Sequence, residues 1–360
     1  MAMSAMYPQR QALQRQRLQF AEGGPVDALA LPPPLQRSWE RTREAGVHPG
    51  DLPHYPAISA HACDAPDDRR LARLVNDEME RLWASFGGRH WTLFCVNTQG
   101  VIVAQRAHGL GVDPLLRPIE PGRRLHERDV GTTAPACVLA DDLPAVVSGD
   151  QHYLSAFDPL FCLSVPLHGL DGELLGALDI TGAGQRDGEL LMGYFRQAAM
   201  AVHNRLFEGL RHASILAVQH DPGWIGTPMQ GLVAVDAQGQ LLAASRIARR
   251  LLGLPRLGTL PVMDLAAMFP DASAAQRRQL LRPGAPHRVR LREDLAVHVQ
   301  LLRGPREGRG AVRTKVPRGT TLREQTRQQV VEALAGNGGN MAATARQLGI
   351  SRTTLYRKLG

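Results

Sequence analysis

Residues 339–359 read GNMAATARQLGISRTTLYRKL, and their spacing predicts two short helices that cross at a tight turn. Asn340 and Ser351 can cap the starts of these helices, because their side-chain oxygens accept bonds from free backbone N–H groups. Ala345 supplies the small residue that a close crossing needs, and Gly349, four residues later, suits the turn. Four apolar side chains would hold the two helices together: Leu348, Ile350, Leu355 and Leu359. The pattern is that of a helix-turn-helix.

The second of these helices carries polar and basic side chains on its outward face. Such side chains contact phosphates and base edges when a helix enters the major groove of double-stranded DNA. We therefore predict DNA contacts from Ser351, Arg352, Thr353, Thr354, Tyr356, Arg357 and Lys358. Tyr356 could instead pack against its neighbours. An ordinary helical hairpin is the alternative for the whole segment, but its outward face would not need these cations.

The positive charge of the chain is concentrated around this segment. Residues 303–360 hold twelve Lys and Arg against three Asp and Glu, whereas the other 302 residues hold 30 against 31. A basic segment attached to a nearly neutral body indicates a polyanionic partner for that segment alone. A solvated basic tail would have the same composition, so the charge supports the motif and does not replace it.

The C-terminal segment resembles the DNA-binding domain of the Fis family, as it is found at the end of NtrC-type, sigma-54-dependent activators. The resemblance implies an all-α DNA-binding domain over residues 321–360 that binds pseudo-palindromic sites as a homodimer. The first helix of the segment, expected over 321–335, would then belong to the dimer surface.

The remainder of the chain predicts two α+β units. After Pro66, apolar residues recur at helical spacing as far as Phe86, and Gly87-Gly88 ends the run. Two strand hairpins follow, and a long helix from about Gly188 closes the first unit. We expect an α+β multidomain chain with a flexible arm at 1–34, a sensory domain at 35–212, a smaller domain at 225–303 and a linker at 304–320.

The sensory unit resembles the N-terminal part of acetoin-regulator-type (AcoR-like) activators, which is built on a GAF domain. The match rests on SWERTREAGVHPGD (38–51), LHERDVGTTAPACVLADDLPAVVSGDQHY (125–153) and FCLSVPLHGLDGELLGALDITG (161–182). The chain departs from the family where Leu125-His126 replaces a usual tryptophan and Thr133 replaces a usual asparagine. A family ligand therefore cannot simply be carried over.

The resemblance implies a GAF pocket for a small organic effector. We expect its walls to include His126, Glu127, Asp129, Cys137, His152 and Tyr153. For the first three residues, the alternative is a solvated loop. Cys137 and Cys162 are more often buried core thiols than metal or redox sites.

The smaller unit over 225–303 resembles a PAS domain, a module for small molecules or protein interactions. The central ATPase of the activators has no counterpart here, because a phosphate-binding loop needs lysine after glycine, whereas Lys315 follows Thr314 and Lys358 follows Arg357. The HExxH and GxSxG motifs and paired metal-ligand spacings do not occur. We expect no enzyme activity, no catalytic residue, no metal site and no cofactor.

Together these patterns predict a cytoplasmic transcription regulator that senses an effector and acts without ATP hydrolysis, with RNA polymerase as a further partner. No apolar run approaches the roughly 20 residues that span a bilayer, so we expect no membrane partner. The alternative is a sensor protein that heterodimerises with a full-length sigma-54 activator and modulates it.

Overall fold

The computed structural model describes most of the chain up to residue 305. The described residues are 3–25, 31–58, 65–109, 113–184, 186–255, 258–292 and 295–305. Residues up to Arg306 form one compact unit and Glu307–Gly360 a second one. The predicted helix-turn-helix and its linker therefore lie outside the described residues.

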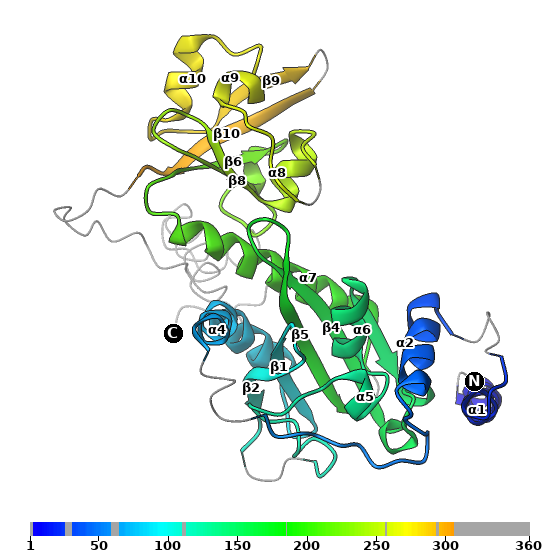
Figure 1. Cartoon of the computed structure of the whole chain (residues 1–360). Coiled ribbons are helices and arrows are strands. Elements are labelled where there is room, and N and C mark those ends of the chain that lie inside the picture. The colour runs from blue at the N-terminus through cyan, green and yellow to red at the C-terminus, as the bar shows by residue number, and fades with distance from the viewer. Residues whose placement is uncertain are drawn as a thin grey trace, which may run out of the picture. The chain divides into compact units, whose positions relative to one another are not determined.

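A five-stranded antiparallel sheet organises the first half of the unit (Figure 1). Its strands are β1 (Trp91–Asn97), β2 (Ile102–Ala107), β3 (Ala145–Ser148), β4 (Leu160–His168) and β5 (Leu174–Ala183), in the order β2-β1-β5-β4-β3. Both hairpins expected from the alternating patterns are present, β1 with β2 and β4 with β5.

Helices cover both faces of this sheet, so its strands are apolar on both sides. On one face, α4 (Pro66–Phe86) and α7 (Gly188–Leu206) pack on Leu163, Val165 and their neighbours. On the other face lie α2 (Pro33–Glu44), α5 (Glu127–Val130) and α6 (Ala134–Asp141). The helical face predicted after Pro66 is confirmed, since Val75, Met79 and Leu82 are buried there.

A second five-stranded antiparallel sheet follows. Its strands are β6 (Ser214–Gln219), β7 (Gly231–Val235), β8 (Leu241–Ala244), β9 (His287–Arg292) and β10 (Leu295–Arg303), in the order β8-β7-β6-β10-β9. Helices α8 (Arg246–Leu251), α9 (Leu265–Met268) and α10 (Ala274–Leu280) belong to this half, and side chains of all three join the buried cluster around Phe269. Short 3-10 turns occur at Gly149–Gln151, Ser155–Phe157, Phe207–Gly209 and Pro222–Trp224.

Strand β6 corrects the expected start of this second domain. The boundary at residue 225 left Ser214–Gln219 outside both domains, yet β6 is the central strand of the second sheet, between β7 and β10. Its short run SILAVQ is apolar on both faces, so it shows no alternation that would mark it as a strand from sequence alone.

The N-terminal residues also differ from the flexible arm that we expected. They form helix α1 (Met3–Ala21), which packs on the half of the unit built around the first sheet. Phe20 and Arg17 are its buried contacts. The Arg17 guanidinium pairs with Asp158 at 2.7 Å and donates to the His152 carbonyl at 2.9 Å. An ion pair of this kind leaves no apolar periodicity in the sequence, which is why the docking was not predicted. Within the described part of the chain, no helix is long and apolar enough to cross a membrane.

Candidate functional site

A small cavity lies on the face of the first sheet that α5 and α6 cover. Its apolar walls include Phe94, Ile119, Leu125, Val130, Phe157 and Leu160, and its polar positions include Thr133, Cys162 and Thr181. The cavity measures about 20 Å³, which is room for about one water molecule. None of the described residues that line it carries a charged side chain.

Thr133 lines this cavity and has a buried hydroxyl without a hydrogen-bond partner among the described residues. Gly131, with a φ of 67°, turns the chain out of α5 in the left-handed region that favours glycine, and Thr133 then becomes the N-cap of α6. An N-cap threonine commonly accepts a bond from its helix, but here the side chain makes no such bond. The residue is only 7% exposed, and its Oγ1 has no hydrogen-bond partner among the described residues.

The floor of the cavity continues into a buried polar stripe on β4 and β5. Cys162 pairs with Thr181 across the two strands, and Ser164 pairs with Asp179 two residues further along. The Thr181 hydroxyl donates to Asp179 Oδ1 at 2.6 Å, while Asp179 Oδ2 has no partner among the described residues. Complete burial raises the pKa of Asp179 well above its ordinary value.

His152 holds the thiol of Cys162 from behind the cavity wall. His152 Nδ1 lies 2.9 Å from the Gly149 carbonyl, which can only accept, so Nδ1 carries the proton. Burial lowers the pKa of His152 to about 4, and Nε2 is therefore free to accept from Cys162 Sγ at 3.3 Å. Burial also raises the pKa of Cys162, so the pair is a thiol and a neutral imidazole, which does not form a nucleophile.

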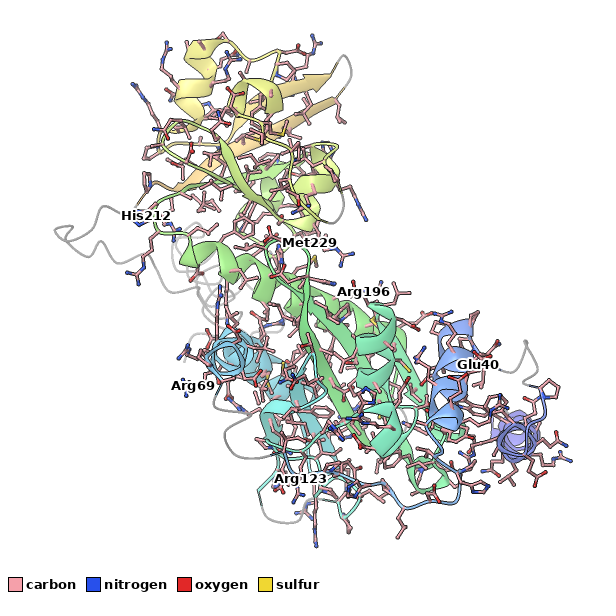
Figure 2. The ribbon with its side chains drawn as sticks, viewed as in Figure 1. Glu40, Arg69, Arg123, Arg196, His212 and Met229 are labelled. Carbon is pink, nitrogen blue, oxygen red and sulfur yellow. The ribbon has the colours of Figure 1, made fainter. Side chains whose placement is uncertain are left out.

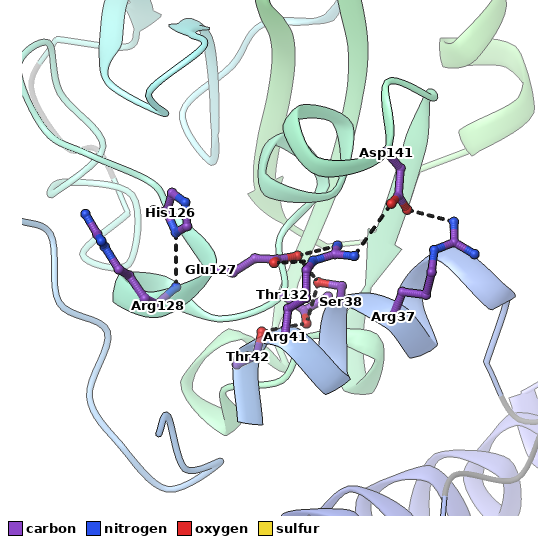
Figure 3. A network of polar contacts seen from close by, with 9 residues as sticks. All are labelled: Arg37, Ser38, Arg41, Thr42, His126, Glu127, Arg128, Thr132 and Asp141. Atoms are coloured by element: carbon purple, nitrogen blue, oxygen red, sulfur yellow. Dashed lines mark hydrogen bonds and ion pairs between the residues drawn. The ribbon is translucent and has the colours of Figure 1, made fainter. Parts of the chain in front are cut away.

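A separate network fixes α5 and the residues around it to α2 (Figure 3). The Glu127 carboxylate accepts from Arg41 Nε at 2.6 Å and from the Ser38 hydroxyl at 2.6 Å. Ser38 also bonds the Thr132 hydroxyl, and Arg37 and Arg41 both reach Asp141 at the end of α6. The network thus clamps the segment that carries Thr133.

The predicted effector residues occupy structural positions around the cavity, and none of the six lines it. Glu127 is held in the network above. His126 caps α5 by accepting from the Arg128 backbone N–H, and Asp129 forms an ion pair with Arg124 at 2.7 Å. His126 is exposed, whereas Glu127 and Asp129 are ion-paired, and a role of these three residues in effector binding stays a prediction.

The other three predicted residues are buried behind the cavity. Tyr153 packs edge-on against Trp39 and Phe20. Cys137 is a core thiol whose pKa burial raises to about 12, and His152 supports Cys162. The sequence reasoning missed Thr133 and Thr181 as wall residues. The signals that could have found them were the family departure at Thr133 and the cross-strand pairing of 161–182.

A larger groove of about 620 Å³ lies where α4 begins, beside the β1–β2 and β4–β5 turns. Its acidic side chains are either exposed, as in Asp171 and Glu173, or partnered, as in Asp68, which accepts from Asn97 at 3.0 Å. The groove offers no buried unpartnered group among the described residues, so the cavity beside Thr133 is the stronger candidate.

Comparison with protein families identifies two parts of the chain. Residues 70–202 match the GAF domain, and residues 321–360 match the bacterial regulatory proteins of the Fis family. Both predicted domain types are confirmed over these residues. The chain thus carries a GAF domain and a Fis-family segment.

Curated relatives of the chain add to this comparison. The chain is 24% identical over 198 residues to the propane 2-monooxygenase operon transcriptional activator MimR of Mycolicibacterium goodii, covering 54% of this chain and 33% of that protein. It is 24% identical over 165 residues to the acetoin dehydrogenase operon transcriptional activator AcoR of Bacillus subtilis, covering 45% and 27%. The acetoin catabolism regulatory protein of Cupriavidus necator is 25% identical over 240 residues, covering 63% and 35%. The chain spans about a third of the length of these relatives.

Comparison with solved structures also finds the Escherichia coli DhaR(N)–DhaL complex. That match has a TM-score of 0.43 and 15% identity, and it covers 74% of this chain and 98% of the other.

The predicted PAS character of residues 225–303 remains a prediction, as do the seven DNA contacts over 351–358, which lie outside the described residues. Among the described residues, no group of three or more His, Cys, Asp or Glu could hold a metal ion.

Proposed function

We propose that this regulator binds operator DNA as a homodimer through residues 321–360 and adjusts that binding when a small organic effector occupies the cavity beside Thr133. The observation that carries the proposal is the Fis-family match over the segment that also holds the positive excess of the chain. Arg352, Arg357 and Lys358 would supply phosphate and base contacts, with Ser351, Thr353, Thr354 and Tyr356 beside them.

The mode of regulation is part of the same proposal. The curated relatives are named transcriptional activators, and neither lysine of this chain follows a glycine as a phosphate-binding loop requires. We therefore infer that the chain acts without ATP hydrolysis, either by occupying its operator or by contacting RNA polymerase. Effector binding would change operator affinity through the geometry of the dimer, because half-site spacing restricts where two recognition helices can lie.

The test uses the full chain. Genomic DNA that co-purifies with the tagged protein is sequenced, and a duplex carrying the enriched motif is titrated by fluorescence anisotropy at several salt concentrations. Arg352→Ala and Arg357→Ala should each weaken binding about tenfold and flatten its salt dependence, because each removes a charged contact. The matched control is Arg196→Ala, since Arg196 is exposed on α7, far along the sequence from the DNA-binding segment (Figure 2).

Two results would contradict the proposal. Unchanged affinity and salt slope in both variants would remove the DNA contacts. Recovery of a larger activator with the protein, and no enriched DNA motif, would favour the heterodimerising sensor instead.

A further inference from the structure

We propose that α10 and strand β9, in the second half of the described unit, form an additional DNA-binding surface that contacts the phosphate backbone beside the operator motif. This inference rests on the proposed function, because it requires that residues 321–360 bring the chain to DNA. It adds nucleic-acid contact to a part of the chain whose resemblance implies small molecules or protein interactions.

The charge of the body is divided unevenly between its two halves. Residues 1–212 hold 20 Arg against 25 Asp and Glu, whereas residues 213–302 hold ten Arg against six Asp and Glu. Within residues 271–292 there are six Arg and one acidic residue, Asp271. Such a local excess of positive charge attracts polyanions.

The arginines of this stretch differ from those of the first half in having no carboxylate partner. In the first half, Arg41 pairs with Glu127 at 2.6 Å and Arg124 with Asp129 at 2.7 Å. Among the described side chains, no arginine between 271 and 290 forms an ion pair. The guanidinium groups of Arg278, Arg282 and Arg290 are exposed and free to pair with phosphate oxygens.

Strand β9 places two arginines side by side next to a groove. Side chains two residues apart on a strand point to the same face, about 7 Å from each other, so Arg288 and Arg290 project together while Val289 is buried. Both line a groove of about 400 Å³, with Asp271 and Gln276 on the α10 side. Strand β9 is the last strand of its sheet, and β10 is its one neighbour there (Figure 1). The edge therefore leaves the groove accessible to a rod-like duplex.

The composition of this surface favours DNA over an acidic protein. Stable protein interfaces are built around apolar and aromatic anchors, yet none of the exposed large apolar side chains of the described residues lies between 271 and 292. Guanidinium groups without an apolar centre suit phosphates, which are contacted regardless of base sequence. The seventeen residues 304–320 can span at most about 60 Å, so the length of the chain allows this surface and residues 321–360 to contact the same duplex.

Arginines on an edge strand have a second explanation, because charge also prevents an edge strand from pairing with another chain. Charge of either sign serves that purpose, whereas a phosphate contact needs positive charge. Replacement by glutamate therefore separates the two explanations.

The test compares two duplexes with the full chain, by fluorescence anisotropy at several salt concentrations. One duplex carries the enriched operator motif alone, and the other adds about 20 base pairs of unrelated sequence on each side, about 70 Å of DNA. The wild type should bind the longer duplex more tightly and with a steeper salt dependence. The double variant Arg288→Gln/Arg290→Gln should lower the slope of log K against log salt by about 2 on the longer duplex, because two phosphate contacts are lost.

The short duplex and two further variants are the controls. Unchanged affinity of each variant for the short duplex shows that it is folded. Arg250→Gln should bind both duplexes as the wild type does, since Arg250 is exposed on α8 in the same half and does not line the groove. Arg288→Glu/Arg290→Glu should bind the longer duplex more weakly than the glutamine variant, because the phosphates then meet like charge.

Several outcomes would overturn the inference. These are equal affinity and salt slope of the wild type on the two duplexes, an unchanged slope in the glutamine variant, and wild-type binding by the glutamate variant, which would assign the arginines to edge protection. Poly-glutamate on beads is a further probe: loss of retention in the glutamine variant, with DNA binding unchanged, would assign the surface to an acidic protein. Each of these leaves the short duplex bound, whereas a wild type that does not bind the short duplex would contradict the proposed function itself.

Discussion

At the scale of single residues, burial decides which polar groups are structural. Glu127 is 6% exposed, and Arg41 and Ser38 both hydrogen-bond its carboxylate. Arg37 lies on the same helix as Arg41 but pairs with Asp141 from an exposed position. The sequence singled out Glu127 as a candidate effector residue but could not show its partners, because Arg41 lies 86 residues away along the chain.

Arg41 and Arg37 give a matched pair of substitutions. Arg41→Gln should lower the free energy of unfolding by about 2 kcal/mol, because it leaves a buried carboxylate without its cation. Arg37→Gln should change it by less than about 0.5 kcal/mol, as is usual for exposed pairs. Urea unfolding of both variants measures the difference, and equal effects would show that burial of Glu127 does not set the strength of the pair.

His152 makes the stability depend on pH. Burial holds its folded-state pKa at about 4 against an ordinary value of 6.5. The unfolded chain therefore binds the proton first, and stability falls as pH decreases from about 6.5 to about 4, by about 3 kcal/mol in all. His152→Asn should show a flatter dependence than the wild type in this window, and the exposed His212→Asn should follow the wild type (Figure 2). Parallel curves for His152→Asn and wild type would contradict this assignment.

At the scale of elements, α1 and β6 are the two that sequence patterns did not indicate. Each is defined by long-range contacts rather than by local periodicity: α1 by the pairing of Arg17 with Asp158, and β6 by strands on both sides. The amphipathic helix after Pro66 and the two hairpins were predictable because their signals repeat within a few residues.

Removing the Arg17 guanidinium should release α1. Arg17 is 3% exposed and also bonds Ser155 Oγ at 3.0 Å. We expect Arg17→Ala to leave the fold intact while making residues 3–25 much more sensitive to limited proteolysis, because the helix loses its main polar attachment. Gln19→Ala, at an exposed position of the same helix, should digest as the wild type does. Equal digestion of both variants would mean that Phe20 alone holds the helix.

Strand β6 should behave as core. Leu216 is fully buried against Val233 and Val299, so Leu216→Ala should cost about 3 kcal/mol through lost burial and the resulting cavity. Leu242→Ala, at a half-exposed position of edge strand β8, should cost less than about 1 kcal/mol. Denaturant unfolding measures both, and a small loss for Leu216→Ala would argue against a central position for β6.

At the scale of the described unit, the two sheets share a buried junction. Phe207, after α7, belongs to one apolar cluster with Ile215 and Leu232 of the second sheet. Arg303 of β10 donates to the carbonyls of Phe207, Glu208 and Leu210. Both sheets therefore belong to one compact unit.

This junction predicts a single cooperative unfolding transition for both sheets. Phe207→Ala should remove about 3–5 kcal/mol and split the transition in two, because it empties the centre of the shared cluster. The fluorescence of Trp224 reports on the second half and that of Trp39 on the first, each measured with the other tryptophans changed to phenylalanine. Two transitions already present in the wild type would contradict the shared core.

The sequence by itself determined the C-terminal helix-turn-helix, its basic charge and the GAF character of the body. The helix-turn-helix rests on caps and spacings that act within a few residues, the GAF character rests on a resemblance to a known family, and family comparison confirms both domain types. Only the tertiary structure decided that Thr133 and Thr181 line one cavity while Glu127 and Asp129 face ion pairs. The physical reason is that strand pairing and helix packing bring together residues tens of positions apart. Which polar groups find a partner depends on that packing, which no local pattern records.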